Sequence, residues 1–515
     1  MPQPDPTPAA LDTRLDKAIG YIAPRMALKR RQSRMLLSAY RSAESTRLRN
    51  NWGLGQQRES TPQSYELSRI RDASRDANRN DPVASGATDT LKLNIVGSGL
   101  HPQARIRADR VGISDERATE LNRQAEAVFR RWSPYADSGN RLDFDEIQFL
   151  ALAKVIEDGE SIVIPTWAKE SWRPFGRCLE MIEADRMDKT TAKIRYGVEL
   201  GTRGEPVQYH IRKADPQTGI VSSEYAQVKA RDNMGRPNIL HIYQAKRPGQ
   251  LRGIPFFAPV LTYFKDISDY LEAEIVAARV AACLAVFITN TDPMASALAM
   301  GPKTETATGA RLEGLEPGLI SRLGLHESIQ VVDPKRPGET FSSFIETMMR
   351  IVGVAIGLPY ELLIKDFSKT NYSSARAALL EGRRMFTQWR NWLARKLCQP
   401  VYEMVLEEAF LRGMFDAKNF YELKHEYCRS IWIGGGWGWV DPVKEIEASR
   451  MAIDYGLSTL AEEAAGQGRD WEEIIEQRKK EETFIENEGV SISRSQKAMG
   501  ADQTGEKEDA ETETK

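Results

Sequence analysis

A long amphipathic pattern begins after Pro259. Apolar side chains recur every three or four positions, with acidic side chains opposite them; the apolar ones are Phe264, Ile267, Leu271 and Ile275. Continued to Ile288, this pattern predicts a helix of about 25 residues, or roughly 37 Å at about 1.5 Å per residue. Prolines and glycines then interrupt residues 291–340, which predicts a small irregular segment.

A second amphipathic helix is predicted from residue 341 onward. Its apolar stripe has the spacing of one helix face and comprises Phe341, Phe344, Ile345, Met348, Met349 and Val352. Ser343 and Glu346 have the spacing of a capping box at its start. Gly357 followed by Pro359 marks the expected end.

A polar loop separates this helix from a third one. The loop, residues 365–372, offers two lysines, small polar side chains and two aromatic rings. Ser373 or Ser374 can cap the third helix, whose apolar positions continue to Leu397. This helix is basic, because Glu381 is outnumbered by Arg376, Arg383, Arg384, Arg390, Arg395 and Lys396.

The chain before Pro259 mixes two periodicities. A helical pattern covers about 115–157. Alternating patterns then predict strands, the middle two forming a hairpin, at 161–165, 198–200, 207–211 and 238–243. We therefore expect an α+β fold that is predominantly helical.

The composition can supply a large core but carries little net charge. Of the 515 residues, 41% are hydrophobic, and the formal net charge is −2. Proteins that grip nucleic acid tightly neutralise many phosphates with Lys and Arg, so this balance argues against such a function while allowing loose DNA contact. The charge is uneven, since residues 12–49 are basic and the tail after Gly500 is acidic. This asymmetry fits either different neighbours for the two ends or two solvated tails.

The sequence predicts a protein of a reducing compartment without a membrane anchor. Its four cysteines lie far apart with no CxxC spacing, which favours buried, reduced thiols. The N-terminus lacks the charged-then-apolar pattern of a signal peptide. The longest apolar run, 275–288, contains Arg279 and is shorter than the roughly 20 residues that span a bilayer.

No motif predicts a catalytic residue, a cofactor or a metal site. Gly97-Ser-Gly99 lacks the third glycine of a dinucleotide fingerprint, and Pro302 interrupts the phosphate-loop order of residues 301–304. Residues 143–146 contain three acidic side chains but are better explained as a helix start. The histidines lack metal-ligand spacing. Backbone N–H groups of residues 434–442 could meet an anion, although a tight turn with two packed indoles is favoured.

Several short segments together resemble the lambda family of phage portal proteins. In chain order they are 77–90, 94–100, 197–200, 206–210, 247–250, 252–255, 273–283, 371–378, 437–442 and 456–460. Each is short, but their order and spacing extend over most of the chain. The resemblance implies a non-enzymatic portal, or head–tail connector. In this family the portal is a ring, usually a dodecamer, whose axial channel passes double-stranded viral DNA during packaging and ejection.

The resemblance also implies an architecture of wing, stem, clip and crown. The expected order is a basic N-terminal arm (1–80), an α+β wing (81–262), a stem helix (263–290), a clip (291–340), a second stem helix (341–363), a tunnel loop (364–374), a long helix with the rest of the wing (375–455), and a crown with the acidic tail (456–515). Expected partners are further copies of the chain, double-stranded viral DNA, the large terminase subunit, the major capsid protein or scaffold, and the head–tail connector protein. The expected location is the capsid vertex of the virion, after assembly in the host cytoplasm.

The tunnel loop is the expected place of DNA contact. Its candidate residues are Lys365, Lys369, Asn371, Tyr372, Ser373 and Arg376, which could touch phosphates without reading bases. A solvent-exposed connector would have a similar composition. Two other functions stay open: a general capsid or scaffold protein, and a packaging enzyme such as an ATPase or a nuclease. For the enzyme, the sequence offers no convincing phosphate loop or acidic metal cluster.

Overall fold

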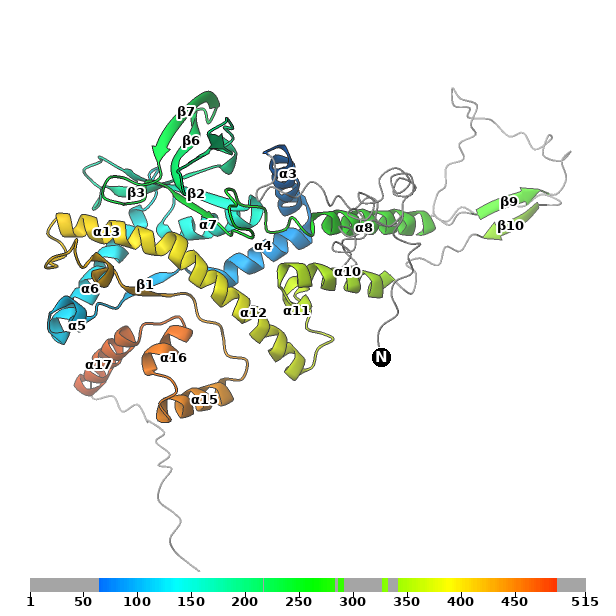
Figure 1. Cartoon of the computed structure of the whole chain (residues 1–515). Helices are drawn as coiled ribbons and strands as arrows, with labels where there is room; N and C mark the ends of the chain where they lie inside the picture. Colours follow the sequence, from blue (N-terminus) through cyan, green and yellow to red (C-terminus); the bar gives the residue numbers. More distant parts are fainter. Residues whose placement is uncertain (1–63, 216, 283–285, 291–326, 332–340, 489–515) are drawn as a thin grey trace, which may run out of the picture.

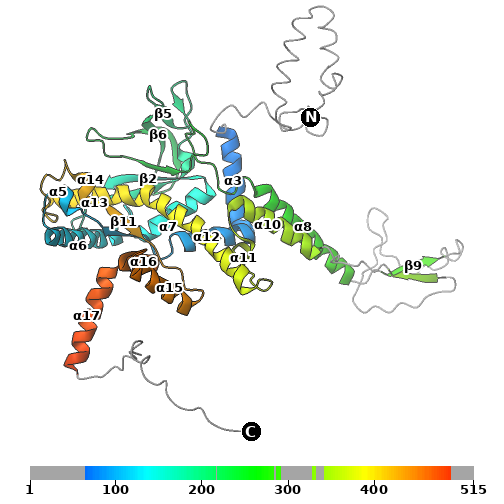
Figure 2. The ribbon, with the colours of Figure 1, turned by 60° about the horizontal axis from the view of Figure 1, so that its bottom comes forward.

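The computed structural model describes residues 64–215, 217–282, 286–290, 327–331 and 341–488. A helical body lies at its centre, two long helices extend from one side, and a small β-sheet rises above the body (Figure 1). The last helices form a separate group below the body in both views (Figures 1 and 2). The fold is α+β and predominantly helical, which confirms the predicted class.

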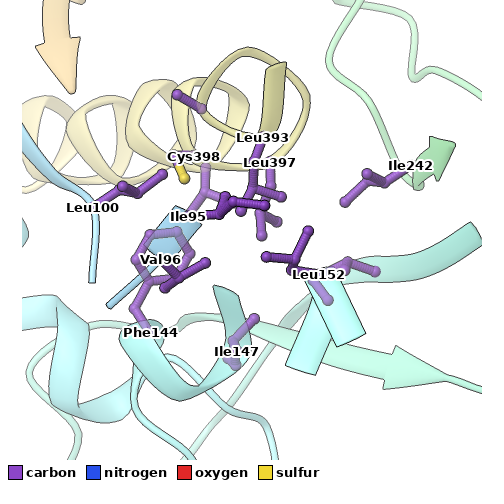
Figure 3. Close-up of a cluster of buried hydrophobic side chains, with 14 of the residues drawn as sticks. Ile95, Val96, Leu100, Phe144, Ile147, Leu152, Ile242, Leu393, Leu397 and Cys398 are labelled. Carbon is purple, nitrogen blue, oxygen red and sulfur yellow. The ribbon is translucent and has the colours of Figure 1, made fainter. Parts of the chain in front are cut away.

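One helical rod runs through the body. Helix α12 (Tyr372–Leu393) continues through a π-helical turn, η5 (Ala394–Cys398), into α13 (Gln399–Leu411). Helices α4 (Pro82–Ile95) and α6 (Asp115–Trp132) pack against this rod, and α7 (Phe144–Glu157) packs against α4. Figure 3 shows the shared core, in which the rod meets α4 and α7 through Leu393, Leu397, Cys398, Ile95, Val96, Phe144, Ile147 and Leu152. Such a core holds the rod in a fixed position.

Local capping explains where two body helices begin. Residues 115–157 form two helices rather than one, because α6 ends at Trp132 and α7 begins at Phe144. The Asp143 side chain accepts from the backbone N–H of Glu146 at 2.8 Å, and Glu146 accepts in return from the backbone of Asp143. This reciprocal capping box confirms that residues 143–146 are a helix start.

The described chain also forms α3 and four shorter helices. They are α3 (Ser64–Asn80), α5 (Ala108–Val111), η3 (Ser133–Tyr135), η4 (Ala184–Arg186) and α14 (Lys424–Tyr427).

The strands form small antiparallel sheets. One has the order β3 (Arg177–Ile182), β2 (Glu160–Trp167), β8 (Leu240–Tyr243). Another has the order β4 (Ile194–Arg195), β5 (Val198–Leu200), β6 (Pro206–Ala214), β7 (Val221–Lys229), and β1 (His101–Ala104) pairs with β11 (Ser430–Ile433). The predicted hairpin is β5–β6, and the other two predicted strands are β2 and β8. Strand β7 escaped prediction because neither of its faces is well buried, which removes the alternation that marks a strand.

A buried ion cluster joins α3, the sheets and the segment that leads into the first long helix. The Glu160 carboxylate is fully buried and accepts from Arg71 at 2.6 Å, from Nε of Arg252 at 2.7 Å and from the backbone N–H of Gly253 at 2.7 Å. His241 lies 3.0 Å from its second oxygen. Burial alone would raise the pKa of Glu160, but Arg252 and Arg71 hold it well below its usual value. The carboxylate is therefore charged, and it holds three segments of the chain together.

The same junction needs glycine at two positions. Gly159 has φ +86°, and a Cβ there would lie 2.3 Å from the backbone of Ile254. A Cβ on Gly253 would lie 2.0 Å from the carbonyl oxygen of Gly159. The two backbones cross at a separation that no side chain permits.

The first long helix is shorter than predicted. Helix α8 (Leu261–Ala282) ends before residues 286–290, which form strand β9 (Val286–Asn290), so the prediction of a helix to Ile288 is wrong. Strand β9 pairs with β10 (Glu327–Val331) in an antiparallel ladder. Its β-branched and aromatic side chains favour a pleated strand once such a partner is present. The expected stem-helix range 263–290 thus contains a strand. The rest of 291–340, the arm before residue 64 and the tail after residue 488 lie outside the described residues.

The second long helix starts earlier than the predicted cap. Helix α10 (Phe341–Ile356) already includes Phe341, whose ring stacks on Tyr270 of α8 at 5.7 Å. Ser343 therefore lies inside the first turn, and the proposed capping box with Glu346 is wrong. Helices α8 and α10 lie side by side in Figures 1 and 2. The predicted end is confirmed, since Gly357 has φ +74° and leaves the helix.

The C-terminal helices bury almost none of their apolar side chains. Helices α15 (Pro442–Asp454) and α17 (Trp471–Asn487) contain no buried residue, and α16 (Leu460–Gly466) buries only Ala464. Ion pairs attach α17 to α6, with 2.6 Å between Arg130 and Glu473.

The glycine–tryptophan segment links these helices to the rod. The Arg390 guanidinium lies 4.4 Å from the Trp437 ring, whereas Trp439 is exposed. The prediction of two packed indoles in a tight turn is therefore right for only one of them, and the residues before α15 take no helix or strand conformation. Trp437 is held by a cation from α12 rather than by the second indole.

Candidate DNA-contacting loop

The predicted tunnel loop lies between a short helix and the rod. Helix α11 (Tyr360–Ile364) packs closely on α12, because a Cβ on Gly382 would lie 2.5 Å from Cδ1 of Leu362. The loop that joins them projects at the end of α12 opposite to α13 (Figure 1). Both of its ends are therefore anchored to elements of the core.

Local turns give the loop its shape. Lys365 ends α11 in the left-handed conformation, with φ 59°. The carboxylate of Asp366 accepts from the backbone N–H of Ser368 at 2.9 Å, and the carbonyl of Phe367 accepts from the backbone N–H of Thr370 at 3.2 Å. Such turns form within the loop itself and need no support from the rest of the fold. They leave Lys365, Phe367 and Ser368 exposed.

One ion pair connects the loop to α10. The Lys369 ammonium donates to the Glu346 carboxylate, and Arg350 lies 3.6 Å from the same carboxylate. The hydrogen bond from Lys369 is the largest cause that lowers the pKa of Glu346, and it raises the pKa of Lys369 in return. The Lys369 side chain is nevertheless 64% exposed, against 18% for Glu346. A ligand could therefore reach the ammonium without entering the protein.

The helix after the loop begins differently from the prediction. Asn371 is the N-cap, and its side-chain oxygen accepts from the backbone N–H of Ser374 at 2.8 Å. The prediction that Ser373 or Ser374 caps the helix is wrong, because both already lie in its first turn. Asn suits this position as well as Ser does, and the sequence contains candidates for the cap at three nearby positions.

The predicted contact residues do not all lie in the loop. Tyr372 and Ser373 are exposed in the first turn of α12, next to Lys365, Lys369 and Asn371 in sequence. Arg376 is only half-exposed and lies within α12. At the start of α15, Lys444, and more weakly Arg376, lower the pKa of Asp441. The structure thus groups five candidates around the loop and places Arg376 farther along the helix.

The sequence of the chain was compared with known protein families. Residues 45–390 match the sequence model of the family described as "Phage portal protein, lambda family". This match covers more than half of the chain. The chain belongs to the lambda family of phage portal proteins. The resemblance drawn from the short segments is confirmed, and the function is that of a portal protein at the capsid vertex.

Known portal proteins align with most of this chain. The "Portal protein" of Escherichia phage N15 is 25% identical, with 84% of this chain and 87% of the relative covered. "Portal protein B" of Escherichia phage lambda is 24% identical, again covering 84% and 87%.

Solved structures of gene transfer agent particles are also similar in part. The neck of an empty particle with C6 symmetry has a TM-score of 0.37 and 16% identity, covering 65% of this chain and 81% of the other. The neck of a native particle with C12 symmetry has a TM-score of 0.38 and 12% identity, covering 79% and 93%. Scores this low do not establish a common fold, so membership of the portal family rests on the sequence.

Outside the loop, the described residues of this portal-family chain form a cleft but no metal-binding group. Within the described ranges, no group of three or more His, Cys, Asp or Glu side chains is placed to hold a metal ion. None of the helices described is long and apolar enough to cross a membrane. A cleft of about 970 Å³ between α6 and α17 is lined by acidic and basic side chains. In it, burial together with Asp470 and Glu472 raises the pKa of Glu126 to about 7.

Glu346 is the residue of this site that sequence reasoning missed. The sequence marks it as part of a helix cap, and it lies 23 positions before Lys369. Only the packing of α11 between α10 and α12 brings the two together. As a carboxylate on α10, Glu346 is a candidate from the sequence, but nothing in the sequence identifies it as the partner of Lys369.

Proposed function

We propose that copies of this chain form a ring, expected to be a dodecamer, at the capsid vertex. Viral double-stranded DNA passes through its axial channel, inward during packaging and outward at ejection. Residues 365–372 face that channel and touch the DNA backbone. The chain itself carries out no catalysis and binds no cofactor.

The observation that carries this proposal is the exposed, basic loop on a rigid base. Lys365 and Lys369 project from a loop that is anchored at both ends to core elements. The loop also leads into the N-terminus of a 22-residue helix, where the helix dipole favours phosphate. Lysine ammonium groups and backbone N–H groups contact phosphates without reading the base sequence, as a conduit for a whole genome requires.

Unpaired apolar surfaces support assembly into a ring. Along α10 the exposed side chains include Phe344, Ile351 and Val354, the last being 85% exposed. Ile275 and Val276 are exposed on the adjacent α8. The C-terminal region adds exposed side chains at Val443, Ile446 and Phe484 in its helices and at Tyr455 and Leu457 between α15 and α16. Exposed apolar side chains in such numbers are typical of protein–protein interfaces.

The low net charge fits a conduit better than a clamp. DNA carries one negative charge per about 1.7 Å of axis, and every lysine that neutralises a phosphate strengthens binding. A net charge of −2 on the whole chain leaves only local basic groups to meet the DNA. Repeated around a ring, these few groups form a circle of positive charge that is weak at each point.

The remaining assignments follow the portal architecture. We infer that residues 81–262 with part of 375–455 form the wing, that α8 and α10 form the stem, and that the region around β9 and β10 belongs to the clip. The clip would dock the large terminase subunit and later the head–tail connector protein. The wing would meet the major capsid protein or scaffold during assembly in the host cytoplasm, and the C-terminal helices would form the crown.

Replacing both loop lysines tests the DNA contact. In K365A/K369A we expect rings of normal appearance by negative-stain microscopy, because both side chains are exposed. The DNA content of assembled particles should fall well below wild type. The matched control K169A/K229A removes the same charge from exposed positions in the α+β body and should package normally. Normal packaging by K365A/K369A would refute the loop assignment, and failure of the wild-type chain to form rings would refute the portal assembly.

A further inference from the structure

The lysine in the middle of the loop already has an anionic partner within its own chain. Lys369 donates to Glu346 of α10, and this ion pair is the connection between the loop and α10. The other hydrogen bonds that shape the loop are local turns within residues 366–374. Glu346 is therefore the carboxylate that accepts a hydrogen bond from the Lys369 ammonium, while Asp366 in the loop adds a weaker electrostatic attraction.

We propose that Glu346 is a positioning residue that holds Lys369 when no phosphate is near and releases it to DNA. This inference rests on the proposed function of the loop. A passing phosphate competes with Glu346 for the ammonium, so each contact with DNA replaces an ion pair that the chain already has. Each contact between Lys369 and a phosphate therefore has a low net affinity, and the DNA can move on until the next phosphate reaches the lysine.

The surroundings of Glu346 allow the exchange in both directions. The carboxylate is mostly covered, whereas Lys369 is largely exposed, so the ammonium is the partner that moves. Arg350 lies one helical turn away, 3.6 Å from the carboxylate, and its ring contact with Tyr360 at 5.1 Å keeps it near. Ser342 lies 3.5 Å from the same carboxylate. When Lys369 leaves, the Glu346 carboxylate therefore keeps the Arg350 guanidinium and the Ser342 hydroxyl as partners.

Exposed ion pairs have a strength suited to this role. An ion pair with this exposure changes the equilibrium between its paired and unpaired states by at most a few-fold. Such a pair is strong enough to define where the ammonium rests and weak enough for a phosphate to displace. Lys365 takes no part in this exchange of partners, because the described residues give it no salt-bridge partner.

A double-mutant cycle on the full-length chain tests the inference. Binding to a fluorescent 30-base-pair duplex would be measured by anisotropy in about 0.1 M salt, for wild type, E346Q, K369Q and E346Q/K369Q, with K365Q as a separate test of the loop. We expect E346Q to bind about twofold to fivefold more tightly than wild type, because Lys369 is then free before DNA arrives. In the K369Q background, E346Q should change affinity little. E381Q, which removes an exposed carboxylate of α12 that pairs with Arg384, is the matched control and should have a smaller effect than E346Q.

Two results would overturn the inference. An equal gain from E346Q with and without Lys369 would mean that the substitution only removes a repulsive charge. No gain from E346Q, while K365Q and K369Q weaken binding, would also refute the exchange and leave the proposed DNA contact intact. If K365Q and K369Q have no effect either, the loop assignment itself fails.

A second measurement reports on the loop without DNA. Trypsin cleaves after lysine, and cleavage requires the side chain to enter the protease. Release from Glu346 should speed cleavage after Lys369 in E346Q relative to cleavage after Lys365 in the same molecules. An unchanged ratio of the two rates would show that the carboxylate does not hold Lys369 in solution.

Discussion

Replacing Glu160 with glutamine should be among the most destabilising single changes in the described part of the chain. The carboxylate is completely buried and accepts from Arg71, Arg252 and the backbone of Gly253, with His241 3.0 Å away. Glutamine has nearly the same shape, but it removes the charge that balances two buried guanidinium groups. Breaking a buried pair by removing one partner costs about 3–5 kcal/mol. For structural units of 150–250 residues this corresponds to a melting temperature lower by roughly 6 °C or more.

The assay is thermal and urea unfolding followed by circular dichroism, with E157Q as control. Glu157 lies three residues away and pairs with Lys154 at 2.9 Å, but it is partly exposed, so its loss should cost less than about 1 kcal/mol. If E160Q is no less stable than E157Q, the cluster is not what holds α3, the sheets and the segment before α8 together.

The pH dependence of the same variant gives a second check. The folded-state pKa of Glu160 lies well below its usual value of 4.5, so its contribution to stability is fully present above that pH. It is lost only as the pH falls through the lower, folded-state value. The stability difference between wild type and E160Q should therefore be constant from pH 8 to pH 6 and shrink in acid. A difference that shrinks near neutral pH would contradict a carboxylate that stays ionised.

Two further predictions concern assembly and the cleft below α6. V354D should leave the monomer folded, because an exposed helix position tolerates Asp within about 0.5 kcal/mol. It should nevertheless prevent ring formation in negative-stain images. The control M234D, at an exposed apolar position in the proposed wing, should still form rings. Intact rings in V354D would exclude this face of α10 from the interface. The pKa of Glu126 is raised to about 7, so the folded chain holds this proton more tightly than the unfolded chain, and the contribution to stability should fall as the pH rises from about 4.5 to 7. E126Q, which can still accept from Ala104, should flatten that part of the profile of melting temperature against pH, and an unchanged profile would contradict the assignment.

The sequence predicted those elements whose signal lies within a few residues. The helix start at residues 143–146, the β5–β6 hairpin and the break at Gly357 are each specified by neighbouring side chains, and all are confirmed. The end of α8 depends on distant pairing, because residues 286–290 become a strand only beside residues 327–331. The N-cap of α12 was missed for another reason, since Asn371, Ser373 and Ser374 can all fill that role and only the backbone selects one.

The sequence predicted where the candidate loop lies along the chain, but it did not predict which residues contact the loop. The family resemblance located the loop, and its polar composition pointed to phosphate contact. Neither could reveal that Lys369 is paired with Glu346, because this contact joins the loop to α10 through the tertiary fold. Of the basic candidates, Lys365 is exposed, Lys369 is exposed but paired with Glu346, and Arg376 is half-exposed.

The loop combines a rigid base with a weakly held tip, and this combination bears on how a conduit works. Below the loop, the Leu362 side chain of α11 packs so closely against Gly382 of α12 that no larger residue fits there without a shift. Helix α12 then continues into the core of the body. Moving those elements would disrupt packing that costs several kcal/mol per buried side chain. Moving the tip requires only that one exposed ion pair exchange its partner. If the loop faces DNA as we propose, a force that the DNA exerts along the channel would displace the tip long before it displaces α12. Lys365 and Lys369 would then follow a phosphate over a short distance while α12 keeps its position.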